Sequence, residues 1–395
     1  MGSNPAAPTI SSAAPPTPLR PERVSLPVDA ICCKVYGFAQ FWAAFLSLPV
    51  SMSMLRNHET SRPVAVWLFA VAALVFAMVV LGGSTRLTGS GLSITEWRPV
   101  TGALPPLSHA AWLAEFQKYQ HIPQYRLINN GMSLAAFQSI YWWEWAHRLL
   151  GRLVGVVFFA PLVAFLSMRR IPGRLIWRAL VIFLLGALQG LVGWWMVASG
   201  LVARVAVAPE RLAIHLGLAL VLFCLLIWTG LEAWFGPGRA NLEMRWRTPA
   251  ALVAGLVFVQ IMLGGLVAGN NAGQVYNDWP LMNGRVFPKD YMGGGGLLHA
   301  LMHSQAAVQF DHRIGAYILM IAAVVAIVVG VRRRELPRGT PPLAFLFAGL
   351  VLVQAALGVL TLVDHAPLPL ALAHQCLAAV VLASALALAW RVRRA

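Results

Sequence analysis

Hydrophobic residues gather in eight long blocks, each of roughly 20 residues, separated by shorter stretches rich in Arg, Gly or Pro. A helix needs about 20 apolar residues to cross the hydrocarbon core of a bilayer. Each block is therefore predicted to be a membrane-spanning helix. The predicted spans cover residues 64–83, 137–167, 177–198, 210–234, 249–268, 307–330, 343–363 and 368–390.

The N-terminal extension, residues 1–62, is not predicted to belong to this helical core. Its first half is rich in Pro, Ala and Ser, a composition typical of disorder. The apolar stretch 31–54 that follows is short for a span. It can be read as an interfacial segment, a signal-like stretch or, the reading we favour, sequence upstream of a true start at Met52 or Met54.

Charged residues are few, and their placement predicts the topology. The chain of 395 residues is 59% hydrophobic and only 11% charged, which excludes an ordinary soluble protein. The formal net charge is +16, but the Arg residues form short runs after spans two, four, six and eight, not a continuous surface for nucleic acid. The positive-inside rule therefore places both termini in the cytoplasm, with loops 84–136 and 269–306 outside.

Several motifs recur along the chain and predict an internal duplication. The recurring pairs are Leu81-Gly82-Gly83 with Leu263-Gly264-Gly265, His147-Arg148 with His312-Arg313, Gln189 and Gly193 with Gln354 and Gly358, and His215 with His374. The predicted fold is an all-α integral membrane protein whose eight transmembrane helices form two pseudo-symmetric four-helix bundles. The predicted bundles cover residues 63–235 and 248–391.

Four histidines occupy repeat-equivalent positions near the outward ends of spans two, four, six and eight. They are His147, His215, His312 and His374. A single intramembrane histidine is more often a hydrogen-bonded core residue. Four at one depth, on helices that can face each other, instead favour two sites in which a pair of imidazoles holds a haem iron. The sequence offers no Cys, Met or carboxylate cluster to complete a zinc or copper site around either pair.

The two halves differ one helical turn before the first histidine of each pair. Glu144 stands three residues before His147, whereas Gln309 stands three residues before His312. A carboxyl group can move protons or stabilise a cationic intermediate, and an amide can only hydrogen-bond. We infer that the N-terminal half performs chemistry and the C-terminal half holds a permanent haem. The alternative for Glu144 is a salt bridge to Arg148 or a hydrogen bond to a ligand histidine.

Three motifs occur in order along the chain. They are Gly82-Gly83-Ser84-Thr85-Arg86-Leu87-Thr88-Gly89-Ser90-Gly91-Leu92-Ser93-Ile94, Trp142-Trp143-Glu144-Trp145-Ala146-His147-Arg148 and Gln309-Phe310-Asp311-His312-Arg313. Together with the long loop between the first two, they resemble the heme A synthase family, in its mitochondrial and alphaproteobacterial branch. The resemblance covers about residues 60–390. The paired loop cysteines of some branches are absent, and His299 and His303 have no counterpart that we recognise.

The resemblance implies an oxidoreductase that converts the C8 methyl group of haem O into a formyl group, giving haem A for terminal oxidases. It implies that His147 and His215 hold the substrate haem, that His312 and His374 bind the iron of a haem b cofactor, and that Glu144 is catalytic. Implied partners are haem O, haem O synthase, an electron donor and membrane lipid, while a homo-oligomer is left open. The implied location is the bacterial cytoplasmic (inner) membrane, in preference to the mitochondrial inner membrane.

Other polar residues have two readings each. Arg86, Arg148 and Arg313 lie near the outer ends of their spans, where haem propionates would emerge, and guanidinium–carboxylate pairing is strong in such sites. Arg148 and Arg313 could equally extend to the membrane interface. His299 and His303 are spaced to share a helix face, but we read them as part of a solvated loop helix and not as a metal site.

Two functional classes remain open from the residues alone. One is the haem-modifying enzyme, and the other is a di-haem electron carrier of the cytochrome b type without substrate chemistry. Carriers that cross the bilayer usually stack their haems at two depths, whereas the four histidines here lie near one face. A transporter is a weaker alternative, because transporter repeats rarely carry repeated histidines.

Overall fold

The computed structural model describes residues 60–237, 244–333, 336 and 338–393. The structural statements that follow concern these residues. The predictions for the N-terminal extension, including a start at Met52 or Met54, lie almost entirely outside them.

Nearly all of the described chain is helical, and eight of its helices are long and apolar enough to cross a membrane. These helices are α2 (Arg62–Leu87), α5 (Leu134–Ser167), α6 (Gly173–Val202), α7 (Pro209–Phe235), α8 (Met244–Gly269), α10 (Gln305–Arg332), α11 (Thr340–Val363) and α12 (Leu368–Arg393). Each coincides with one predicted span and extends beyond it at one end or both. The predicted all-α membrane fold with eight spans is confirmed.

Local signals explain where several of these helices begin and end. The side chain of Ser133 accepts a hydrogen bond from the backbone N–H of Ala136 at the start of α5. Ser304 caps α10 in the same way through the N–H of Ala307. Both serines satisfy a helix N–H that has no partner within the helix. At the C-terminal end of α7, Gly236 adopts φ 83°, a conformation that favours glycine and ends the helix.

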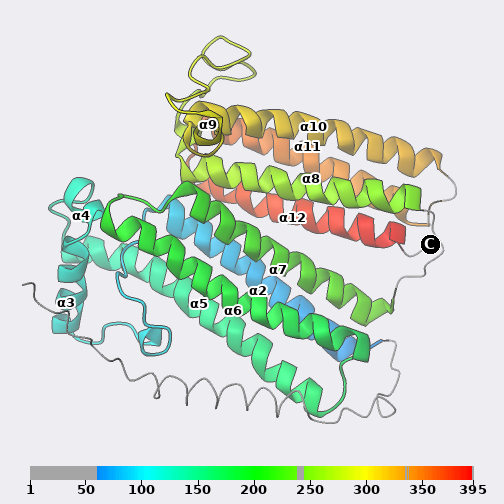
Figure 1. The fold of residues 1–395 in the computed structure, drawn as a ribbon, viewed down its shortest axis with the longest axis horizontal. Coiled ribbons are helices and arrows are strands. Elements are labelled where there is room, and N and C mark those ends of the chain that lie inside the picture. The colour runs from blue at the N-terminus through cyan, green and yellow to red at the C-terminus, as the bar shows by residue number, and fades with distance from the viewer. Residues whose placement is uncertain (1–59, 238–243, 334–335, 337, 394–395) are drawn as a thin grey trace, which may run out of the picture. The chain divides into compact units, whose positions relative to one another are not determined.

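The helices pack in two groups. In the first, α2 contacts α5 and α7, and α6 contacts the same two helices. In the second, α8 contacts α10 and α12, and α11 also contacts both of these. The groups meet where α7 contacts α8 and where α12 contacts α2 and α7 (Figure 1). The division into pseudo-symmetric bundles of residues 63–235 and 248–391, and the duplication behind it, remain predictions.

The connections that carry short helices lie at one end of this helical body, and the described C-terminal end lies at the other (Figure 1). They contain α3 (His109–Gln120), α4 (Pro123–Leu127) and α9 (Leu297–His303). An apolar cluster joins the first of these connections to α5, with Tyr119 and Phe137 fully buried in it. Leu92 belongs to the same cluster, which holds the segment just before Ser93 against the body.

Candidate functional site

The four histidines predicted to bind haem share one packing arrangement. Each lies on one membrane-spanning helix and directs its Cε1 edge at a glycine of a neighbouring one. A Cβ atom added to Gly82 would lie 2.8 Å from His147, and one added to Gly193 would lie 2.9 Å from His215. The corresponding distances are 3.1 Å from Gly264 to His312 and 2.8 Å from Gly358 to His374. Since real Cβ atoms rarely approach so closely, a side chain at any of these glycines would have to displace the imidazole.

The imidazoles of His312 and His374 face each other across the second group of helices. Their ring centres are 6.4 Å apart and their planes differ by 80°. Two imidazoles that bind one metal ion from opposite sides place their ring centres roughly 6 Å apart, because a metal–nitrogen bond is about 2 Å long. This pair therefore fits a haem iron held by two histidines. In the first group, His147 lies on α5 and His215 on α7, and both helices contact α2.

Three of the four histidines also contact a glutamine amide from the helix that supplies the glycine. Nε2 of Gln189 lies 3.2 Å from Nδ1 of His215, Nε2 of Gln260 lies 3.0 Å from Nδ1 of His312, and Nε2 of Gln354 lies 3.2 Å from Nδ1 of His374. The same Nε2 donates to the backbone carbonyl of each histidine. Gln260 was not singled out from the sequence. Its signal is a glutamine four residues before a glycine, a spacing that all three glutamines share.

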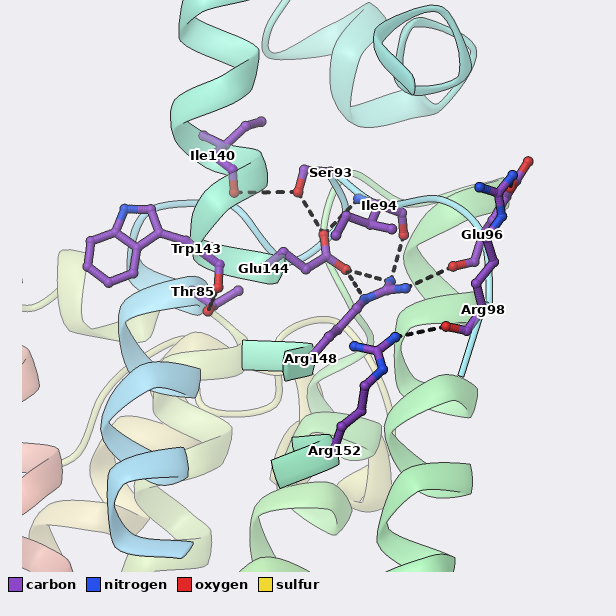
Figure 2. Close-up of polar contacts among 10 residues, drawn as sticks. All are labelled: Thr85, Ser93, Ile94, Glu96, Arg98, Ile140, Trp143, Glu144, Arg148 and Arg152. Carbon is purple, nitrogen blue, oxygen red and sulfur yellow. Dashed lines mark hydrogen bonds and ion pairs between the residues drawn. The ribbon is translucent and has the colours of Figure 1, made fainter. Parts of the chain in front are cut away.

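Glu144 is almost completely buried, with 3% of its surface exposed, and both of its carboxylate oxygens are engaged (Figure 2). Its Oε2 accepts hydrogen bonds from the hydroxyl of Ser93 and the backbone N–H of Ile94, both at 2.8 Å. Its Oε1 accepts from Nε and Nη2 of Arg148 at 3.1 and 2.6 Å. The salt bridge to Arg148, the alternative reading of the sequence, is therefore present, and it is charge-assisted.

Arg148 also fixes the outer segment that follows Ser93. Its Nη1 donates to the backbone carbonyl of Glu96 at 2.8 Å, and its Nη2 donates to that of Ile94 at 2.7 Å (Figure 2). One turn later, Arg152 donates to the carbonyls of Arg98 and Pro99. These two arginines thus hold residues 94–99, in the connection between α2 and α5, against α5.

The second group of helices has a similar set of contacts around Arg313, but Gln309 there donates hydrogen bonds to its loop, whereas Glu144 accepts them. Arg313 donates to the carbonyl of Tyr276 and to Oε1 of Gln309, as Arg148 does to Ile94 and Glu144. The amide Nε2 of Gln309, however, donates to the carbonyls of Ala272 and Val275 at 2.7 and 2.6 Å. The loop above α10 thus offers acceptors to an amide, whereas the loop above α5 offers donors to a carboxylate.

The three arginines predicted near the propionates already have protein partners. Arg86 reaches from α2 to the end of α8, where its Nη2 donates to the carbonyl of Ala268 and to Oδ1 of Asn271. Arg148 and Arg313 brace the two outer loops. The Nε atoms of Arg86 and Arg313 are buried and have no hydrogen-bond partner.

A cavity of about 520 Å³ lies beside Arg148, lined by residues of the segment 94–108, of α3 and of α5. Charged residues of both signs line it, among them Glu96, Lys118 and Arg152. Hydrogen bonding to Lys118 lowers the pKa of the Glu96 carboxyl, which keeps this group ionised. The cavity is thus a polar space beside α5, next to Arg148, which pairs with Glu144.

His299 and His303 lie on the short helix α9, with ring centres 5.1 Å apart. Their helical placement agrees with the predicted loop helix. Within the described ranges, no group of three or more His, Cys, Asp or Glu side chains could hold a metal ion.

Residues 65–386 match a family model described as cytochrome oxidase assembly protein. A heme A synthase of Caulobacter sp. (strain K31) is 59% identical over 343 residues, which are 87% of this chain and 100% of that protein. The heme A synthase of Caulobacter vibrioides is 60% identical with the same coverage. That of Maricaulis maris is 48% identical over 340 residues, 86% of this chain and 98% of the relative.

Proposed function

Because the chain belongs to the heme A synthase family, we propose that it oxidises the C8 methyl group of haem O to a formyl group. The conversion removes two hydrogens from the methyl carbon and adds one oxygen, so the protein acts as an oxidoreductase on a CH group. The product is haem A, which terminal oxidases use. The site must bind one haem as substrate. It must also provide a route by which the electrons and protons released from the methyl group leave the reacting carbon.

The observation that carries this proposal is the pair His312 and His374, whose ring centres are 6.4 Å apart. These imidazoles would bind the iron of a haem b cofactor, and that haem would supply electron transfer when bound. The glycines opposite them leave space for the rings, and the glutamines fix the ring orientation. The role of the chain at this site would be to hold two imidazoles at the separation that one iron requires.

In the first half, His147 and His215 would hold the substrate haem. Their rings make the same glycine contacts as the rings of the other pair. Arg86 is the candidate to pair with a propionate of this haem, since it lies on α2 of the first group and its Nε has no partner. Arg148 and Arg313 would assist mainly by keeping the outer loops closed over the haem level.

Glu144 would be the acid–base group of the reaction. It lies one helical turn from His147, it is buried, and its counterpart in the other half is the amide Gln309. Its carboxylate pairs with Arg148, and a carboxylate can stabilise positive charge or accept a proton from the reacting group.

The chain is a multi-pass membrane protein, and we place it in the bacterial cytoplasmic membrane with both ends inside. The described C-terminal end carries Arg391 and Arg393, and the turn between α5 and α6 on the same side carries Arg169 and Arg170. The outer loops and the four histidines then lie toward the outer face. A haem O synthase in the same membrane would deliver the substrate, and an electron-transfer partner would complete the redox cycle.

The test is pigment analysis in a bacterial host that makes haem O but no haem A. The full chain is expressed in this host, and the membrane haems are extracted, separated by chromatography and identified by mass. We expect haem A with the chain and only haem O without it. A di-haem electron carrier would leave the haem O unchanged, and that result would reject the enzymatic proposal.

A further inference from the structure

The cavity beside α5 contains one cation that no carboxylate of the described residues neutralises. Three of its four basic lining residues form ion pairs: Arg98 and Lys118 with Glu96 and Glu115, and Arg148 with Glu144. The fourth is Arg152, which is partly exposed. Its Nη2 and Nε donate to the backbone carbonyls of Arg98 and Pro99 (Figure 2), and its Nη1 has no hydrogen-bond partner. The charge of Arg152 is therefore free to attract an anion.

Arg152 is also the last charged residue before the apolar part of α5. Residues 153–167 contain no Asp, Glu, Lys or Arg, and as a helix they extend for about 22 Å. An uncharged apolar stretch of this length belongs in the hydrocarbon core of the bilayer. Arg152 therefore stands where this core ends, at the depth of phospholipid head groups.

An exposed apolar track runs along α5 from Arg152 into the membrane. Val156, Phe159 and Val163 follow Arg152 by four, seven and eleven residues, so they share its helix face. Their exposed fractions are 63%, 49% and 49%. At the neighbouring Gly155, an added Cβ atom would meet nothing within 4 Å. This face has space for an acyl chain whose head group lies at Arg152.

We propose that the cavity beside α5 binds the head group of an anionic phospholipid, with its phosphate at Arg152 and an acyl chain along the apolar track. A guanidinium group pairs with phosphate through charge-assisted hydrogen bonds. The volume of about 520 Å³ lies within the range of small-molecule sites. A lipid with one net negative charge matches the unpaired charge of Arg152, whereas a zwitterionic lipid would add an ammonium group beside Arg98 and Lys118. Lipid binding here is separate from the haem chemistry and is tested without measuring activity.

The experiment measures lipid binding to the purified full chain by native mass spectrometry. The chain is stripped of lipid in a neutral detergent and mixed with equal amounts of phosphatidylglycerol and phosphatidylcholine that carry the same acyl chains. We expect the chain to bind phosphatidylglycerol in preference. Arg152→Gln should lower the affinity for phosphatidylglycerol about five-fold, the contribution of one basic residue to the attraction of anionic lipid. The affinity for phosphatidylcholine should not change.

Arg126→Gln is the matched control for the loss of one charge. Arg126 lies on α4 in the same connection between α2 and α5, it is exposed, and it does not line the cavity. This variant should bind phosphatidylglycerol as the parent does, and Arg152→Lys, which keeps the charge, should retain most of the binding. Equal affinities for phosphatidylglycerol in Arg152→Gln and Arg126→Gln would overturn the proposal, because net charge alone would then explain them.

A second pair of variants adds charge to the cavity without touching Arg152. Thr101 lines the cavity and is exposed, so both Thr101→Glu and Thr101→Gln are expected to fold. Thr101→Glu should weaken phosphatidylglycerol binding, and Thr101→Gln should not. If Arg152→Gln unfolds because it loses its bonds to the loop carbonyls, this pair decides, and parental affinity in Thr101→Glu would reject the proposal.

Inorganic phosphate separates a lipid site from a site for free phosphate. Added in excess, it should leave phosphatidylglycerol bound, because it has no acyl chain to lie along Val156, Phe159 and Val163. Displacement of the lipid by phosphate alone would show that the apolar track takes no part, and would overturn the assignment of the site to a phospholipid.

Discussion

Arg148 donates both Nε and Nη2 to Oε1 of Glu144, which precedes it by one turn on α5. Oε2 of Glu144 accepts from Ser93 and Ile94, while Nη2 of Arg148 also donates to the carbonyl of Ile94 and Nη1 donates to that of Glu96. One buried carboxylate thus joins the helix that carries His147 to the loop above it. Any chemistry assigned to Glu144 must be separated experimentally from this structural role.

Glu144→Gln is expected to lower haem A formation by about 10²–10⁴, the range for loss of an acid–base group. Haem O or a partly oxidised, hydroxylated haem should accumulate. The amide can still accept from Arg148, as Gln309 does from Arg313. Its NH₂ group would then face the N–H of Ile94, and leaving that buried donor unpaired costs about 1–3 kcal/mol of stability.

The matched control is Ser93→Ala, which removes one hydrogen bond to Oε2 but keeps the carboxylate. Pigment extraction and thermal unfolding in detergent are measured for both variants. Chemistry at Glu144 predicts a large loss of activity only for Glu144→Gln. An equal loss in Ser93→Ala would mean that Glu144 acts only by holding the loop.

His312→Ala and His374→Ala should each remove the haem that co-purifies with the chain, because one iron depends on both imidazoles. The absorption spectrum and the haem content of the purified protein measure this. Ile314→Ala, a neighbouring substitution on an exposed part of α10, should keep the haem. A spectrum that neither histidine variant changes would show that haem is bound elsewhere.

The sequence predicted the eight spans and the four histidines because both depend on features that a single chain displays. The length of an apolar block predicts a membrane span, and the recurring motifs single out the four histidines. The partners of Glu144 could not be found this way, since Ile94 contributes a backbone N–H and Arg148 reaches backbone carbonyls. Backbone groups carry no sequence signal. Gln260 was missed because its repeat counterpart is Met78, so no recurring pair marked it.

The topology predicts that a reporter enzyme fused after the last residue is active in the cytoplasm. Eight spans return the chain to the side on which the first one begins, and the Arg runs place that side inside. A second fusion in the loop before α9, at Gly294, should report an outward position. Reversed signals from the two fusions would also reverse the depth assigned to the histidines.

Glu232 is expected to make the most stabilising polar contacts at the C-terminal end of α7. It is 4% exposed, and its carboxylate pairs with Arg178 of α6 at 2.8 Å and with Arg393 of α12 at 3.2 Å. Glu232→Gln removes the charge that both guanidinium groups share and should cost about 1–3 kcal/mol, seen as a lower unfolding temperature in detergent. The half-exposed Glu96 is the comparison: Glu96→Gln should cost no more than about 1 kcal/mol. Equal decreases in the unfolding temperature of the two variants would mean that the burial of Glu232 adds nothing to the stability that its ion pairs provide.

Gly82→Ala tests whether the space beside His147 is required. The added methyl carbon would lie 2.8 Å from Cε1 of this histidine, so the ring must move away from α2. A histidine displaced in this way cannot keep the position of an axial ligand, and we expect loss of the substrate haem and of haem A formation, with the haem b content unchanged.

Gly155→Ala is the matched control for this substitution. Gly155 lies on α5 two turns after His147, and a Cβ there would meet nothing within 4 Å. Alanine is favoured over glycine inside a helix by about 1 kcal/mol, so this variant should be at least as stable as the parent and fully active. If Gly82→Ala also retains its substrate haem, the close glycine contact is not needed for ligation. The packing that all four histidines share would then reflect only how closely their helices approach.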